Sequence, residues 1–244
     1  MTADAALERV RAYWTDQLGF DPDRANGVLI ARPEGTLTGY NGVYVFRHGY
    51  SCIVSPPAEY RALLRDALAG STPDAAFNTS TLTAALGGAA GEVVGPAWIG
   101  VADEEDFRPP EGLPHVRPLQ ASDRPALLAL RDAAGPHDWD VSAIEPERAP
   151  IFGVFERDAL LAASSYEPWG EHARAVGVVT HPRHRHHGYG RAVATAATAH
   201  ALKQGFVMLW QTLESNAPSM AIARSLGYQP YARTIAIRLR ERGS

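Results

Sequence analysis

A loop within residues 178–197, VVTHPRHRHHGYGRAVATAA, gathers four histidines, three arginines and two glycines between an apolar run and an alanine-rich segment. A strand that enters a helix through such a loop leaves backbone N–H groups unpaired at the positive end of the helix dipole, where anions bind. Gly188 and Gly190 lack the Cβ that would keep an anion from these amides, and Arg185 and Arg191 add positive charge. The stretch predicts an anion site. The alternative is a tight turn with solvated basic neighbours.

Two common phosphate loops do not fit this stretch. The nucleotide loop GxxxxGK[ST] needs a lysine after its second glycine, and the sole lysine of the chain, Lys203, lies well beyond the loop. The dinucleotide loop GxGxxG needs a third glycine where this chain has Val193, and it needs its first glycine directly after the strand. A third pattern, R/Q-x-x-G-x-G/A, fits residues 185–190.

The third pattern resembles the acyl-CoA diphosphate loop of the GCN5-related N-acetyltransferases (GNAT). A second motif of that family, N-x-x-A/S followed by L-G-F/Y, is matched one helix and one strand downstream by Asn216, Ser219 and the run Leu226-Gly227-Tyr228. The resemblance covers about residues 113–240. It implies a mixed α/β fold of the GNAT type, with a central mixed sheet flanked by helices, and acetyl-CoA as the co-substrate.

The resemblance also assigns the contacts to acetyl-CoA. Backbone groups of Val178, Val179 and Thr180 would pair with the pantetheine arm like an added strand. Asn216 would form a hydrogen bond to the pantetheine from the opposite wall, and Ser219 of the same motif would also contact the cofactor. The diphosphate would be held by the amides of the loop, that is, by Arg185, His186, His187, Gly188, Tyr189, Gly190 and Arg191.

Direct attack of an amine on the thioester needs a base for the ammonium and a proton for the departing thiolate. Family members often have a tyrosine acid four residues before the glycine of the L-G pair and a glutamate on the fourth strand. Here these positions hold Ala223 and Arg174. We predict Glu167 as the base and as a contact of the acceptor, because partial desolvation at a strand end would raise its pKa. A solvated loop glutamate is the alternative.

The acid and the acceptor site are less well defined. Ser219 or a water supplies the proton, or the thiolate leaves unprotonated, as its ordinary pKa of about 8.5 permits. In the family the segment after the first helix, here residues 135–150, binds the acceptor. His137, Asp138, Trp139 and Asp140 would form a lid, whose one aromatic ring and two acids suit a cationic amine; the alternative is that Trp139 is a core residue. Since the usual acid and base are missing, a non-catalytic acyl-CoA-binding or sensor protein stays open.

We predict no metal site at the four histidines, because zinc needs about four converging ligands and neighbouring residues of an extended loop point apart. The net charge of -4 argues against nucleic acid as an obligatory partner. No apolar run approaches the roughly 18 residues of a membrane span. With Cys52 as the only cysteine, we expect a cytoplasmic protein, and the preference for arginine over lysine suggests a bacterial source. The sequence leaves a homodimer open.

The organisation predicted for the 244 residues is two domains joined by FRPPEGLP, residues 107–114. An N-terminal α/β domain of unknown role, residues 1–106, precedes the acetyltransferase domain, residues 115–244. Residues 50–68 repeat the strand, proline and helix order of the anion loop, so the first half is open to being a degenerate copy of the second. The predicted helices span residues 3–18, 57–69, 122–135, 190–205 and 217–228. The predicted strands include residues 27–32, 41–47, 50–55, 92–103, 173–182, 206–213 and 233–240. Residues 151–169 are predicted to form a hairpin that turns at Arg157-Asp158.

Overall fold

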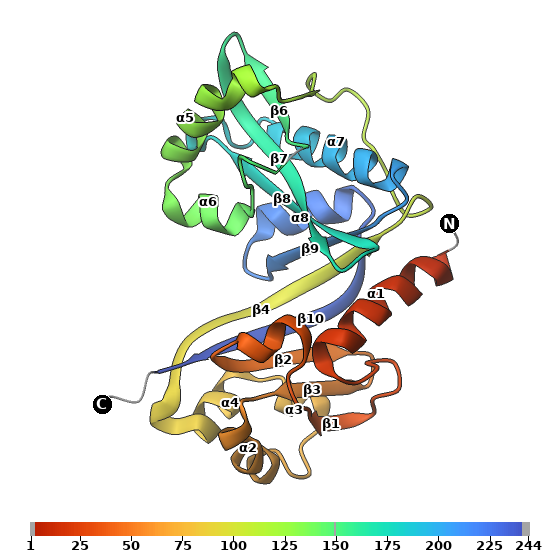
Figure 1. Cartoon of the computed structure of the whole chain (residues 1–244), viewed down its shortest axis with the longest axis vertical. Helices are drawn as coiled ribbons and strands as arrows, with labels where there is room; N and C mark the ends of the chain where they lie inside the picture. Colours follow the sequence, from red (N-terminus) through yellow and green to blue (C-terminus); the bar gives the residue numbers. More distant parts are fainter. Residues whose placement is uncertain (1–2, 149, 241–244) are drawn as a thin grey trace. The chain divides into compact units, whose positions relative to one another are not determined.

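The computed structural model of the chain describes residues 3–148 and 150–240 (Figure 1). Residues 1–2, 149 and 241–244, which belong to the two predicted domains, lie outside the described residues. The described chain forms two compact units: unit 1 contains residues 3–6, 101–211 without 149, and 218–229, and unit 2 contains residues 7–100, 212–217 and 230–240. The division at a 107–114 linker stays a prediction, and it differs from these units in placing residues 230–240 in the second half.

Unit 1 is built on a mixed sheet whose strands follow the order β9-β8-β7-β6-β5. Neighbours from β5 to β8 pair antiparallel, whereas β8 and β9 pair parallel. The hairpin between β6 and β7 turns at Arg157, as predicted, and this residue adopts a left-handed φ of 54°. The strands are β5 (Arg117–Pro118), β6 (Phe152–Glu156), β7 (Ala159–Trp169), β8 (Ala173–Thr180) and β9 (Val207–Leu213), whose last two residues belong to unit 2.

Helices pack on both faces of this sheet. Helices α5 and α6 contact β7 and β8 from one face, and α7 contacts β6, β7 and β8 from the other (Figure 1). The small alanine side chains of α7 allow a close approach to the strands, and Gly205 ends the helix with a φ of 80°. The helices are α5 (Arg124–Ala134), α6 (Pro136–Ser142), α7 (Tyr189–Lys203) and α8 (Ala217–Ser225), with short 3-10 turns at Ala121–Asp123 and Pro182–His184.

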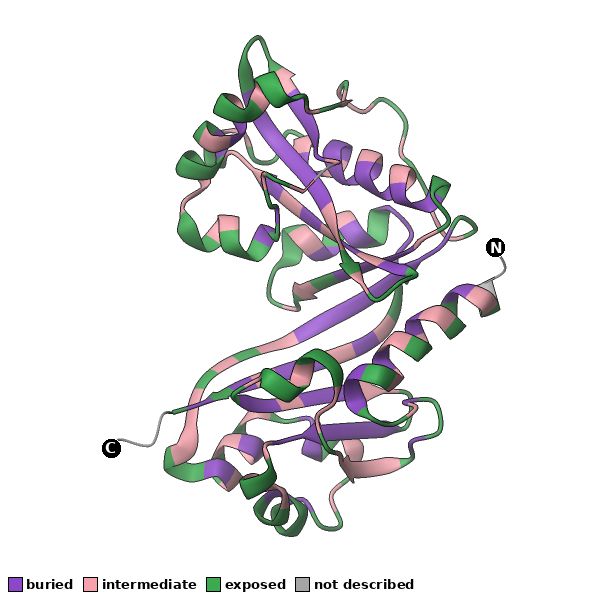
Figure 2. Ribbon diagram, in the orientation of Figure 1, coloured by how far each residue is buried: buried purple, intermediate pink, exposed green. Residues whose placement is uncertain are grey.

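The alternation of side chains along β7 and β8 separates two cores. Ala163 and Val179 are buried with Leu127 of α5 on one face. The preceding residue of β7, Ala162, is buried with Val193 of α7 on the other. Successive residues of a strand point to opposite faces, so both faces of these strands need apolar residues. Figure 2 shows β6 and β7 as largely buried strands between the helices.

In unit 2 the strands follow the order β1-β3-β2-β10-β4 and pair in both parallel and antiparallel fashion. Strand β1 is parallel to β3, and β2 is antiparallel to both β3 and β10. Trp14 of α1 stacks on Tyr44, with ring centroids 6.2 Å apart, and closes one face. The elements are α1 (Ala3–Leu18), β1 (Gly27–Ile30), β2 (Gly42–His48), β3 (Ser51–Ser55), α2 (Arg61–Ala67), α3 (Pro73–Ala76), α4 (Thr79–Leu86), β4 (Ala90–Ala102) and β10 (Gln229–Leu239), with 3-10 turns at Gly35–Gly39, Ala58–Tyr60 and Gly87–Ala89.

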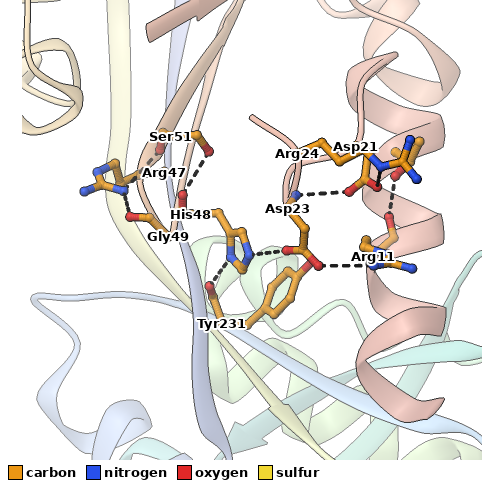
Figure 3. Close-up of polar contacts among 10 residues, drawn as sticks. Arg11, Asp21, Asp23, Arg24, Arg47, His48, Gly49, Ser51 and Tyr231 are labelled. Atoms are coloured by element: carbon orange, nitrogen blue, oxygen red, sulfur yellow. Dashed lines mark hydrogen bonds and ion pairs between the residues drawn. The ribbon is translucent and has the colours of Figure 1, made fainter. Parts of the chain in front are cut away.

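A polar cluster fixes the loop after α1 onto the sheet of unit 2 (Figure 3). His48 Nε2 lies 2.7 Å from Asp23 Oδ1, and His48 Nδ1 lies 2.7 Å from the carbonyl oxygen of Tyr231. The second oxygen of Asp23 lies 3.5 Å from Arg11 Nη1 on α1. Burial raises the pKa of the Tyr231 phenol above its ordinary value. The cluster therefore joins α1, β2 and β10 around one carboxylate.

Most predicted elements are confirmed, with differences that have physical reasons. Asp123 occupies the N-cap position of α5, but its carboxylate accepts hydrogen bonds from Arg117 and from the Gln120 amide instead of capping that helix.

The short helices α3, α4 and α6 were not predicted. In unit 2 the parallel partner of β3 precedes it in the chain, whereas β9 follows β8, so the two halves differ in connectivity. None of the described helices is both long and apolar enough to cross a membrane.

Candidate functional site

Strand β8 separates from β9 partway along its length. The register with β9 covers Ala173 to Ala175, and the last pair joins Ala175 to Leu209. The register with β7 covers the whole strand to Thr180. Among the described residues, therefore, no register pair links residues 176–180 to β9. This leaves one backbone edge of Val178, Val179 and Thr180 open to an extended ligand that lies along it.

The loop after β8 contains several backbone amides that have no acceptor among the described residues. His181 ends the strand by donating its amide to the Leu161 carbonyl, at 2.8 Å. His186 and Gly188 then adopt left-handed φ values of 66° and 79°, and α7 begins at Tyr189. No residue that the structure describes accepts a hydrogen bond from the amides of residues 185–188. The first amides of a helix have no intrahelical acceptor either, so the loop and the start of α7 present a row of donors.

Gly190 brings the start of α7 onto the end of β8. A Cβ built on Gly190 would lie 2.9 Å from Thr180 Oγ1 and 3.6 Å from Val178 Cγ1. It would also lie 3.5 Å from Ile222 Cδ1, which places α8 beside the same glycine. The predicted strand residues and the predicted loop are thus brought together, with α8 as a third neighbour.

The charged side chains of the loop differ in their partners. Arg191 has a buried Nε atom with no hydrogen-bond partner among the described residues. Arg185 donates from Nη2 to the carboxylate of Asp138, which lies 47 residues earlier, on α6. His187 Nδ1 lies 2.7 Å from the Arg185 carbonyl oxygen, and its ring stacks on Tyr189 at a centroid distance of 5.8 Å. Two cations and a row of amides form an arrangement that fits an anion such as a diphosphate.

The histidines of the loop show no sign of converging on an ion. His181 and His184 have ring centroids 5.0 Å apart and edge-to-face geometry. Burial, followed by the charges of His184 and Arg183, lowers the pKa of His181. Within residues 3–148 and 150–240, no group of three or more histidine, cysteine, aspartate or glutamate residues is placed to hold a metal ion.

Glu167 lies near the end of β7, as predicted, and is partly buried. Its side chain is 32% exposed, and Oε1 accepts a hydrogen bond of 3.1 Å from the Trp169 indole. Arg148 Nη1 lies 3.9 Å from its other oxygen. Two other carboxylate or imidazole candidates, Glu171 and His172, are 92% and 58% exposed. Glu167 is therefore the most shielded of the three, and it has the polar partners of an ionised carboxylate.

The positions that carry the usual acid and base of the family are occupied by residues with structural contacts. The guanidinium of Arg174 stacks on Phe206 at 3.6 Å, and its Nη1 donates to the Ala173 carbonyl at 2.7 Å. Ala223 is fully buried in α8. Ser219, one turn earlier in α8, accepts a 3.0 Å hydrogen bond from the Trp210 indole. Asn216 belongs to unit 2, in the turn between β9 and α8.

Within residues 135–150, the segment predicted to bind the acceptor, Pro136–Ser142 form the helix α6, which contacts β8. Trp139 is half-buried and packs against the core cluster that includes Val179, which favours the core role over a role in the lid. His137 is exposed on the first turn. The last residue of α6, Ser142, places its carbonyl so close to Gly177 that a Cβ there would lie 1.8 Å from the oxygen. No described contact joins His137 or Glu167 to the loop.

Sequence reasoning missed three features of this site: the ion pair of Arg185 with Asp138, the close approach at Gly177, and the Arg148 partner of Glu167. All three join residues that are distant in sequence. The helix α6 did have a local signal, because Gly135 followed by Pro136 is typical of a helix start with proline in the first turn.

Comparison with known proteins identifies a family match in the second half of the chain. Residues 115–228 match the model of a family described as the acetyltransferase (GNAT) family. Among curated protein sequences, none matches the chain.

Solved structures extend the likeness beyond these residues. An acetyltransferase of the GNAT family from Colwellia psychrerythraea is 14% identical, with 98% of each chain covered and a TM-score of 0.53. A GCN5-related N-acetyltransferase-like protein from Streptococcus suis 89/1591 is 13% identical, with 96% of this chain and 100% of that chain covered and a TM-score of 0.51. A GCN5-related N-acetyltransferase from Kribbella flavida is 20% identical over 67% of this chain and 63% of its own, with a TM-score of 0.50. These likenesses concern the fold, and they confirm the predicted GNAT-type mixed sheet flanked by helices.

Proposed function

Residues 115–228 form a domain of the acetyltransferase (GNAT) family, as the two sequence motifs predicted, and on this premise we propose that the protein transfers the acetyl group of acetyl-CoA to the primary amine of a small molecule or amino-acid-like substrate. The observation that carries the proposal is the separation of β8 from β9 directly before the glycine loop. An open strand edge suits the amide-containing pantetheine arm, and a helix start with free amides suits the diphosphate.

The acyl donor would lie along this edge. Backbone groups of residues 178–180 bind the pantetheine arm, and the amides of residues 185–191 bind the diphosphate. The fit is supported by the unpartnered Nε of Arg191 and by the left-handed Gly188, whose missing Cβ leaves open space over the amides. Asn216 is our candidate for a further hydrogen bond to the pantetheine. No metal takes part in this proposal.

Glu167 is our candidate base and acceptor contact. An ionised carboxylate attracts an ammonium acceptor and takes up its proton, after which the neutral nitrogen attacks the thioester carbon. The C–S bond then breaks and the acylated nitrogen gives its excess proton to solvent, while the thiolate leaves with a proton from Ser219 or water, or leaves as the anion. His137 and Trp139 of α6 are the candidates for the acceptor side, with Trp139 acting mainly through packing.

A non-catalytic acyl-CoA-binding protein is the second candidate function. It is favoured by the positions of the usual acid and base, where Ala223 has no proton to give and Arg174 is held by Phe206 and a backbone carbonyl. The two functions share the donor site and differ in turnover.

Release of free thiol from acetyl-CoA, measured with a panel of small primary amines, separates the two functions. The transferase predicts thiol release that depends on one class of amine and exceeds the rate without amine. Binding of acetyl-CoA without release for any amine supports the sensor. If acetyl-CoA does not bind, both functions are wrong.

A further inference from the structure

We propose that Asp138 and Arg185 form a latch between the acceptor helix and the donor loop. In the protein without acyl donor, Asp138 of α6 holds the guanidinium of Arg185. The diphosphate of the donor then takes the place of the Asp138 carboxylate. This inference rests on the proposed function, because it assigns Arg185 to the diphosphate.

The ion pair joins two parts of the site that the sequence separates by 47 residues. Arg185 Nη2 donates to Asp138 Oδ2, and the two side chains are 46% and 38% exposed. Arg185 is the arginine of the R-x-x-G-x-G pattern, and its backbone carbonyl holds His187. The guanidinium has five N–H donors, of which Nη2 is used by Asp138, and the latch requires the diphosphate to take this same Nη2 edge, so that the two anions compete for it.

Helix α6 is held near its start by the ion pair of Asp138 and at its end by backbone packing on β8. The helix is bounded by two left-handed residues, Gly135 with a φ of 83° and Ala143 with a φ of 51°. Its last residue, Ser142, contacts Gly177 of β8 through backbone atoms and donates from Oγ to the Trp139 carbonyl at 2.7 Å. The first turn is joined to the loop through Asp138. Exchange of the Arg185 partner therefore removes the ion pair at Asp138 and leaves the packing of α6 on β8 in place.

The latch makes the negative charge of Asp138 available to the acceptor only when the acyl donor is bound. While the loop is empty, the Asp138 carboxylate is paired with the Arg185 guanidinium. It becomes able to bind another cation once the diphosphate has taken the guanidinium. Coupling between two binding events is reciprocal, so a cationic amine that binds Asp138 raises the affinity for the donor by the same factor. The structure thus favours a positively charged acceptor over a neutral one.

The test is the affinity for CoA alone, measured by calorimetry at low ionic strength on the wild type, Asp138→Asn and Asp140→Asn. Asp140 is the matched control, because it is exposed on the same helix and its replacement removes the same charge. Exposed ion pairs contribute about 0.2–1 kcal/mol, so loss of the competing carboxylate should raise the CoA affinity of Asp138→Asn about 1.5- to 5-fold above that of Asp140→Asn. Simple damage to α6 would lower the affinity instead.

A double-mutant cycle assigns the gain to Arg185. In the background of Arg185→Gln, a residue that the family pattern also accepts, Asp138→Asn should give no gain over Asp140→Asn. The latch is wrong if the two aspartate variants bind CoA equally in the wild-type background, or if the gain persists with glutamine at position 185. If the wild type does not bind CoA at all, the proposed function is wrong. This outcome distinguishes failure of the proposed function from failure of the latch alone.

Discussion

Gly177 is the point at which β8 has no room for any side chain. A Cβ at this position would lie 1.8 Å from the carbonyl oxygen of Ser142 and 3.0 Å from its carbonyl carbon. Both are backbone atoms at the end of α6, so no rotamer change relieves the contact. The substitution Gly177→Ala therefore forces α6 and β8 apart, by at least about 1.2 Å if the oxygen is to reach the 3.0 Å that real contacts need.

The cost of this displacement follows from overpacking in a closely packed interior, which is about 1–3 kcal/mol for added methyl or methylene groups. In a chain of 244 residues each kcal/mol lowers the unfolding midpoint by about 2–4 °C, so the expected decrease is about 2–12 °C. The same displacement shifts Val178, the first residue of the donor edge, and we expect weaker binding of acetyl-CoA.

Thermal unfolding followed by circular dichroism measures the effect, with Gly39→Ala as the control. Gly39 has an ordinary φ and no heavy atom within 4 Å of the place a Cβ would take, so its variant should differ from the wild type by less than about 0.5 kcal/mol. Equal midpoints for the two variants would refute the close approach of α6 to β8, and with it the support of the donor edge by that helix.

Three further changes have expected outcomes. Glu167→Gln should retain acetyl-CoA affinity while turnover falls by about 10²–10⁴ and the acidic limb of the pH–rate profile disappears; near-full rate with the same limb would assign the base elsewhere. Asn216→Ala should weaken acetyl-CoA binding about five-fold in calorimetry, the equivalent of one hydrogen bond of about 1 kcal/mol, and an unchanged affinity would remove Asn216 from the site. Cys52 is fully buried and burial raises its pKa to about 12, so a thiol reagent at pH 8 should label it only after unfolding in urea; fast labelling of the native protein would contradict its burial.

The parts of the fold that local chemistry decides were predicted from the sequence. The hairpin at Arg157, the strand that precedes the glycine loop and the helix that Gly205 ends depend on residues within one turn or one element. Gly227 of the second motif shows why such a glycine is required, because it has a φ of 92° and a Cβ there would lie 2.0 Å from the Asp106 carbonyl oxygen. The pattern identified the glycine without identifying what approaches it.

The parts that depend on tertiary contacts were not predicted. A glycine inside a strand indicates that something comes close, but nothing near Gly177 in sequence names Ser142 as the neighbour. The partner of Arg185 depends on how α6 lies along β8, and α6 itself was taken as an irregular lid. The Arg148 partner of Glu167 was not predicted for the same reason, since it comes from a segment that is distant in sequence.

Calorimetry of acetyl-CoA with the wild type, Gly188→Asn and Gly188→Asp tests the donor site most directly. Gly188 has a φ of 79° and open space around its missing Cβ, and asparagine and aspartate tolerate this left-handed conformation better than other side chains, so both variants should fold. They have nearly the same shape and differ in charge. The diphosphate site predicts binding by the wild type, weaker binding by the asparagine variant and no measurable binding by the aspartate variant. Wild-type affinity in Gly188→Asp would contradict the assignment of this loop to the diphosphate.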